Sequence, residues 1–150
     1  MEQLDGLPES TTHIVLSSGG NDALIAKDQL FPRSGQNSRN GLELLSQFQV
    51  SFRKDYSALL NALKRLNRPI TVCTIYDAIP GLESIQKTAL STFNDVILLE
   101  AARRGFSVID LRLLCDEATD YSTVSPIEPS EQGGLKIARA ISGIVEKLPK

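Results

Sequence analysis

Three short apolar runs rich in β-branched residues constrain most strongly what this chain can fold into. They are residues 13–17 (HIVLS), 70–76 (ITVCTIY) and 106–111 (FSVIDL). Nearly continuous apolarity over so few residues is typical of strands that are covered on both faces, as in a parallel sheet. Long stretches separate the runs, and long crossovers between strands favour parallel pairing with right-handed connections.

The stretches around those runs carry apolar residues at helical spacing. Residues 42–66, 85–101 and 135–148 each place apolar side chains at steps of three and four, which puts them on one helix face. Arginines at 103–104 followed by a glycine are a helix stop, and Ser130 is a suitable N-cap for the last helix. The polar residues 28–40 predict a surface loop. The order of these elements predicts an α/β protein, a three-layer α/β/α sandwich around a parallel sheet.

Length and composition narrow the class of protein. The chain has 150 residues, which predicts a single domain over residues 1–150, and its formal net charge is −2. No charge excess favours nucleic acid, and no apolar run approaches the length of a membrane span. One histidine in the whole chain excludes a multi-histidine metal site. Cys73 and Cys115 match no zinc or disulfide pattern, and the acidic N-terminus lacks the features of a signal peptide. We therefore expect a cytoplasmic protein without metal, cofactor, nucleic-acid partner or membrane partner.

The segment after the first apolar run carries the most chemical information. Gly19 and Gly20 permit a tight turn and a close approach of backbone to a ligand. Asn21 then offers a neutral amide that can donate to a developing oxyanion, and Asp22 can cap a helix that starts at Ala23. The alternative is an ordinary strand–turn–helix junction in which Asn21 and Asp22 have only local roles.

Two blocks resemble motifs of one enzyme family. Residues 15–22 (VLSSGGND) resemble the Gly-x-Asn-Asp block of the SGNH hydrolases, the GDSL-like esterases and lipases. Residues 126–134 (PIEPSEQGG) resemble the last block of that family, where Asp-x-x-His-Pro-Ser precedes a glycine and the final helix. The resemblance implies a flavodoxin-like SGNH hydrolase fold and ester hydrolysis through an acyl-enzyme without a cofactor. It also implies that Asn21 contributes to the oxyanion hole beside Gly20.

The chain departs from this family at its catalytic groups. The family's nucleophilic serine lies in a Gly-Asp-Ser motif, which this sequence lacks, so the chain resembles a fold truncated to about three strands. Ser125 stands where the family has aspartate, and Glu128 stands where it has the histidine base. A carboxylate is a weaker base than imidazole at neutral pH unless burial raises its pKa. Asp110 and Asp120 are further candidate acids near the last predicted strand, although a solvated loop is the favoured explanation for each of them.

Two functions follow from this resemblance. The first is an ester hydrolase that acts on a small molecule but is inactive as this isolated chain. The second is a non-catalytic α/β module, derived from such a hydrolase, that binds a ligand or a partner. The family has a further strand beside the one at residues 13–17, and this neighbour is missing here, so residues 13–17 should form an exposed edge of the sheet. Exposed edge strands tend to pair with another chain. We therefore expect a homodimer in which two first strands pair antiparallel across a twofold axis.

Overall fold

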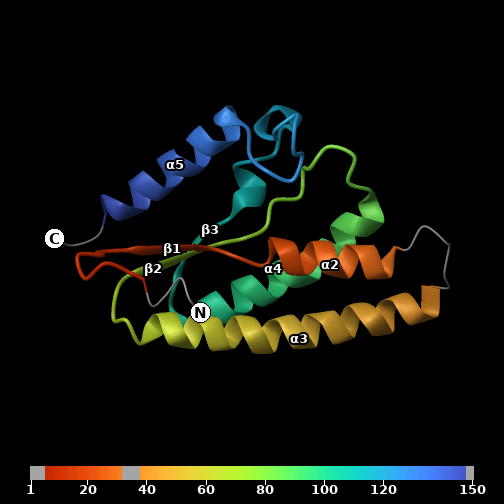
Figure 1. Ribbon diagram of the computed structural model, residues 1–150, viewed down its shortest axis with the longest axis horizontal. Helices are drawn as coiled ribbons and strands as arrows, with labels where there is room; N and C mark the ends of the chain where they lie inside the picture. Colours follow the sequence, from red (N-terminus) through yellow and green to blue (C-terminus); the bar gives the residue numbers. More distant parts are fainter. Residues whose placement is uncertain (1–5, 32–37, 148–150) are drawn as a thin grey trace.

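A three-stranded parallel sheet lies between two layers of helices in the computed structural model, which describes residues 6–31 and 38–147 (Figure 1). The strands are β1 (Ile14–Ser17), β2 (Ile70–Cys73) and β3 (Ser107–Ile109), in the order β1-β2-β3. Both neighbouring pairs are parallel. The predicted α/β class, the parallel sheet and its three strands are confirmed. The second and third strands end earlier than their apolar runs, so residues 74–76 leave the sheet as a loop.

Three helices cover one face of the sheet, and a single helix covers the other (Figure 1). The first group is α2 (Gly20–Leu30), α3 (Ser38–Lys64) and α4 (Ser84–Arg104), and the single helix is α5 (Glu131–Val145). Two short 3₁₀ turns, Leu111–Leu113 and Ala118–Asp120, connect β3 to α5. Of the predicted loop at 28–40, both ends are helical, and residues 32–37 lie outside the described residues. No helix in the described ranges has the length and apolarity needed to cross a membrane.

The two faces of the sheet have hydrophobic cores of unequal size. The larger core joins the sheet to α2, α3 and α4 through buried side chains such as Phe52, Leu60 and Phe93. The rings of Phe52 and Phe93 lie 5.1 Å apart between their centroids. The smaller core contains Cys73, Ile109 and Leu111, and α5 adds only partly buried side chains to it. Since burial of a large apolar side chain contributes roughly 1.5–3 kcal/mol, α5 is held less strongly than the helices of the other layer.

The position of each strand in the sheet determines how well it is covered. All four residues of the central strand β2 are buried, as its apolar run predicts. The expectation of full cover is wrong for β3, where Ser107 and Val108 are exposed. In β1, only Ile14 is fully buried. The reason is that β1 and β3 are the edge strands of the described sheet, so each has one neighbour.

The predicted boundaries of α4 and α5 are confirmed by hydrogen bonds. Helix α4 ends at Gly105, whose backbone N–H donates to the carbonyls at the end of the helix. At the start of α5, the Ser130 hydroxyl accepts a hydrogen bond of 3.2 Å from the Gly133 N–H. A Cβ at position 133 would overlap the carbonyl oxygen of Asp120, so glycine lets α5 approach the preceding 3₁₀ turn closely.

Candidate functional site

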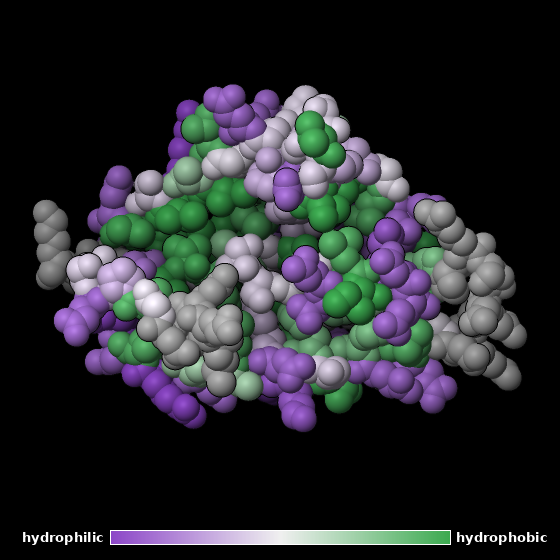
Figure 2. Space-filling model, in the orientation of Figure 1, coloured by the Kyte–Doolittle hydropathy of each residue, from purple (hydrophilic) through white to green (hydrophobic). Residues whose placement is uncertain are grey.

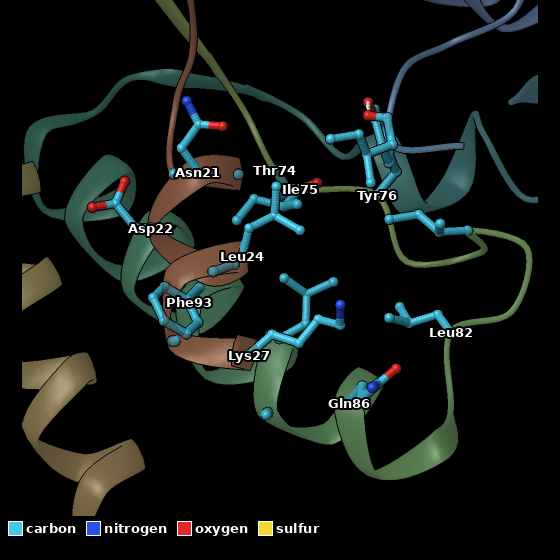
Figure 3. A pocket seen from close by; sticks show the side chains of 18 of the residues that line it. Asn21, Asp22, Leu24, Lys27, Thr74, Ile75, Tyr76, Leu82, Gln86 and Phe93 are labelled. Atoms are coloured by element: carbon cyan, nitrogen blue, oxygen red, sulfur yellow. Dashed lines mark hydrogen bonds between the residues drawn. The ribbon is translucent and has the colours of Figure 1, made fainter. Parts of the chain in front are cut away.

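A cavity of about 400 Å³ opens at the carboxyl ends of β1 and β2, between α2 and the start of α4 (Figure 3). Ligands of open α/β sheets bind at this end of the strands. The apolar lining includes Leu24, Leu30, Ile79, Leu82, Leu90 and Phe93. The polar side chains that line it are Ser17, Ser18, Asn21, Asp22, Lys27, Thr74, Tyr76 and Gln86. Such a lining suits a small, mainly apolar ligand with a few polar groups.

The turn between β1 and α2 places Asn21 at the end of the cavity nearest the strands. Gly19 has φ 108°, a left-handed conformation, and a Cβ there would lie 2.9 Å from Cζ of Phe52. This conformation lets α2 begin at Gly20, so Asn21 lies in its first turn, exposed at the rim. The cavity thus has a side-chain amide close to the positive end of a helix dipole.

The predicted cap of α2 by Asp22 is wrong. Gly19 is the N-cap residue, and no side chain caps this helix. Asp22 lies inside the first turn, and Figure 3 shows its carboxylate directed away from Tyr76 and Leu82. The left-handed Gly19 starts the helix earlier than the sequence pattern suggests, which moves Asp22 from the cap position into the helix.

Buried polar side chains hold the loop that follows β2. The Asn94 amide is fully buried in α4, accepts a hydrogen bond of 2.7 Å from the Ile75 N–H and donates one of 2.8 Å to the Ile75 carbonyl. The Thr74 hydroxyl donates to Asp110 over 2.8 Å and accepts from the Leu111 N–H over 2.9 Å. Sequence reasoning did not identify Asn94 as a positioning residue. The sequence feature that could have pointed to Asn94 is the presence of a polar amide within the apolar stripe of α4.

Asp110 belongs to this supporting network and not to the cavity lining. Its carboxylate accepts hydrogen bonds from the Arg112 guanidinium, with 2.8 Å between Nε and Oδ1. The hydrogen bonds from Arg112 lower the pKa of Asp110 to about 2, and burial opposes them only in part. Asp110 is therefore a fixed anion that orients Thr74 at the end of β2.

Asp120 is likewise committed to a structural ion pair. Its side chain is fully buried and accepts from Lys136 Nζ over 2.8 Å and from Gln132 Nε2 over 3.1 Å. Burial raises the pKa of Asp120, but the hydrogen bonds from Lys136, the Glu117 N–H and Gln132 outweigh it, so the pKa lies below its usual range. This cluster joins the second 3₁₀ turn to α5, away from the cavity lining.

Glu128 lies on the exposed loop before α5, one residue beyond the cavity rim. The neighbouring Ile127 lines the cavity, and its carbonyl accepts a hydrogen bond of 2.6 Å from the Tyr76 hydroxyl. Burial raises the pKa of Tyr76, and electrostatic interactions with Cys115 and Glu128 add to that rise. The structure therefore brings Glu128 close to Tyr76 and near the cavity that contains Asn21.

The two serines at the cavity have no basic partner. Ser17 and Ser18 line the cavity, but neither forms a hydrogen bond with a basic side chain among residues 6–31 and 41–147. His13 lies at the opposite end of β1, with its Nε2 2.9 Å from the Thr71 hydroxyl. Both cysteines are buried and free, and burial raises the pKa of each thiol, to about 11 for Cys73.

Two polar residues of the cavity were not predicted from the sequence. Lys27 and Gln86 line its other end, where Figure 3 shows them beside Leu82. They come from α2 and α4, which only the folded chain brings together. In the described residues, no cluster of three or more histidine, cysteine, aspartate or glutamate side chains could hold a metal ion.

Comparison with known proteins finds similarity at the level of structure. No protein-family model matches the sequence, and no curated protein matches it. The chain superimposes on LAE5, an α/β hydrolase enzyme from the metagenome of Lake Arreo, Spain, with a TM-score of 0.68, 16% identity and cover of 99% of this chain and 66% of that one. An extracellular lipase from Streptomyces rimosus superimposes with a TM-score of 0.61 and 18% identity, and the match covers 92% of this chain and 72% of the lipase. A member of the lipolytic G-D-S-L family from Veillonella parvula superimposes with a TM-score of 0.58 and 16% identity, and the match covers 98% of this chain and 70% of that protein.

These similarities establish the fold of the chain. It has the α/β fold shared by these three solved structures, one of which is a member of the lipolytic G-D-S-L family, in agreement with the fold that the two sequence blocks imply. The chain spans just under two thirds of the length of LAE5.

Proposed function

We propose that the cavity binds the acyl and carbonyl part of a small ester, with the Asn21 amide donating a hydrogen bond to the carbonyl oxygen. The observation that carries this proposal is the position of Asn21. It is an exposed amide at the cavity rim, in the first turn of a helix and at the carboxyl end of the sheet. A neutral donor beside a helix N-terminus suits an oxygen on which negative charge develops.

Ester hydrolysis also needs a nucleophile and a base, and the described residues that line the cavity offer no such pair. Ser17 and Ser18 lie at the cavity without a basic partner in the described chain, and Glu128 is an exposed carboxylate beyond the rim. In this proposal the chain supplies the carbonyl-binding half of an ester-hydrolase site. It binds an ester as the isolated chain without hydrolysing it.

Ligand-observed NMR with ethyl butyrate and labelling by a fluorophosphonate probe test this proposal together. We expect saturable binding that Asn21→Ala weakens, because the variant removes the donor to the carbonyl. Gln29→Ala is the matched control, because Gln29 is an exposed amide of the same helix outside the cavity lining. Equal binding by wild type and Asn21→Ala would contradict the role of Asn21. Stoichiometric labelling of Ser17 or Ser18 would show that the chain is an enzyme by itself.

In any catalytically complete form of this protein, the substitution Asn21→Ala should affect the rate of hydrolysis more strongly than it affects ligand binding. There, we expect Asn21→Ala to lower kcat by about 10²–10³, the usual effect of removing one oxyanion donor. The KM should change much less, because the donor acts mainly on the transition state. An unchanged kcat would reduce Asn21 to a helix-terminus residue.

The second proposed function, a partner-binding module, is favoured by the edge of β1. In the described sheet β1 pairs with β2 alone, and its Val15 and Leu16 are only partly buried. Figure 2 shows apolar side chains gathered between α5 and the other helix layer, around this strand. The partner we propose is a second copy of this chain.

A cytoplasmic location remains part of the proposal, and the free, buried thiols of Cys73 and Cys115 support it.

A further inference from the structure

We propose that the cavity selects ligands with two polar ends, a neutral ester carbonyl and an anionic terminus joined by an aliphatic chain. Lys27 would receive the anion, and the ligand class is the half-esters of aliphatic dicarboxylic acids. The inference rests on the proposed function, since Asn21 would bind the carbonyl end.

The first support is the placement of Lys27 along α2. Gly20, Leu24, Lys27 and Phe31 follow steps of three and four along this helix, and all of them line the cavity. Asn21 and Lys27 are six residues apart, so their backbones are separated by about 9 Å along the helix axis and turned by about 120° around it. Both residues nevertheless line the cavity, Asn21 at the strand end and Lys27 toward Leu82 and Gln86.

The second support is a donor on the opposite wall. Gln86 lies in the first turn of α4, and its Oε1 accepts a hydrogen bond of 3.1 Å from the Glu83 N–H. Because the oxygen is used there, Nε2 of the amide is left to donate. Figure 3 shows Lys27 extending toward the segment that carries Leu82 and Gln86. Donors from two helices thus converge at the end of the cavity away from Asn21.

The third support is the balance of charge around the cavity. Lys27 is the one cation among the described residues that line it, and its ion pair is with the highly exposed Asp28, over 3.7 Å. An exposed pair of this kind contributes little, so it competes weakly with a ligand. The Glu83 carboxylate caps the first turn of α4. Asp22 lies at the Asn21 end and is directed away from the cavity centre. Among the described residues that line the cavity, Asp22 is therefore the one acid, and its carboxylate is directed away from the end toward which Lys27 extends.

The apolar part of the lining completes the match. Leu24, Leu82 and Leu90 line the same cavity. They suit methylene groups, whose burial contributes about 0.8 kcal/mol each. Because Asn21 and Lys27 enter the cavity from backbone positions about 9 Å apart along α2, we expect a preference for a spacer of intermediate length.

Calorimetric titration of the full chain with monoethyl suberate and with ethyl 8-hydroxyoctanoate tests the inference. The two ligands share the ester and a chain of the same length, and only the first carries an anion. We expect wild type to bind monoethyl suberate about tenfold more tightly, the scale of one charge-assisted contact. Monoethyl succinate, which is too short to reach both ends, should lose most of this advantage.

Variants then assign the anion to its site. Lys27→Met keeps the apolar stem and should bring the affinities for the two ligands together, by weakening the binding of monoethyl suberate. Gln86→Leu should reduce in part the preference for monoethyl suberate over ethyl 8-hydroxyoctanoate. Lys87→Met is the matched control, because Lys87 is an exposed lysine of α4 outside the cavity lining. Circular dichroism verifies that each variant is folded.

The possible outcomes separate this inference from the proposed function. If wild type binds both ligands equally, or if the preference survives Lys27→Met, the inference is wrong. The proposed function then still stands, provided that Asn21→Ala weakens binding of the neutral ester. If neither ligand binds to the folded chain, both proposals are wrong.

Discussion

At Gly19, two independent constraints act on one residue. Its φ of 108° is strained for any L side chain, and the ring of Phe52 occupies the space that a Cβ would need. We expect Gly19→Ala to lower the free energy of unfolding by about 1–3 kcal/mol, the usual cost of such local strain. Gly20→Ala is the control, because position 20 is open and helical, and it should raise that free energy by about 0.5 kcal/mol. Urea denaturation measures both free energies of unfolding. Similar effects of the two variants would contradict the claim that position 19 requires glycine.

Asp110 gives a prediction about pH. Hydrogen bonds from Arg112 lower its pKa to about 2 in the folded chain, whereas the unfolded chain has the ordinary value. A carboxyl whose pKa is depressed by folding stabilises the fold above its unfolded pKa, and this contribution is lost as the pH falls toward the folded pKa. We expect wild type to exceed Asp110→Asn in free energy of unfolding by about 2 kcal/mol at neutral pH.

This gap should shrink between about pH 4 and pH 2, where the ordinary and the folded pKa values lie. Arg112→Met removes the partner cation and should reduce the same pH-dependent contribution, although the Thr74 hydroxyl and the backbone N–H of residue 112 still donate to Asp110. Urea denaturation at several pH values measures both variants against wild type. A gap that stays constant across this range would mean that Asp110 is not held as an anion by Arg112.

Among the secondary-structure elements, α5 is the one with the weakest attachment. Its apolar side chains Ile137, Ile141 and Ile144 are only partly buried against the smaller core. The Asp120–Lys136 ion pair provides its main polar anchor. We expect the backbone amides of α5 to exchange with deuterium through an opening of lower free energy than those of α4. The variant Lys136→Met should accelerate the exchange of the α5 amides and leave that of the α4 amides unchanged. Equal protection of α4 and α5, measured by hydrogen exchange, would contradict this ranking.

The elements also show how far the sequence predicts this fold. The strand and helix order, the helix stop at Gly105 and the Ser130 cap follow from local patterns, since each depends on neighbours in the sequence. The start of α2 does not, because the left-handed Gly19 and not Asp22 sets it. The exposed face of Val108 also escapes prediction, because an apolar run does not reveal whether its strand is central or at an edge.

Prediction of the site was limited for a related reason. Asn21 could be found because its glycine-rich turn adjoins a strand end in the sequence. Lys27 and Gln86 could not, because they lie on two helices that meet only in the folded chain. Asp110 and Asp120 were candidates on sequence position alone, and their partners Arg112 and Lys136 assign both to structural ion pairs.

At the scale of the whole molecule, we expect the open edge of β1 to determine how the chain behaves at high concentration. The strand pairs with β2 alone in the described sheet, and the apolar side chains around it are only partly covered. An uncovered edge presents backbone donors and acceptors to other chains. We expect a twofold dimer with two β1 strands antiparallel across the axis, since such a contact uses the same surface on both copies.

Sedimentation velocity across the micromolar range should show a shift from monomer to dimer. Deuterium exchange of the β1 amides should slow as the dimer forms, because their second edge becomes hydrogen-bonded. Val15→Lys places a charge on this edge and should keep the chain monomeric. Val108→Lys, on the exposed edge strand at the other side of the sheet, is the matched control and should leave the dimer intact. A monomer at every concentration would contradict the prediction, as would a dimer that only Val108→Lys disrupts, since β3 would then be the edge that pairs.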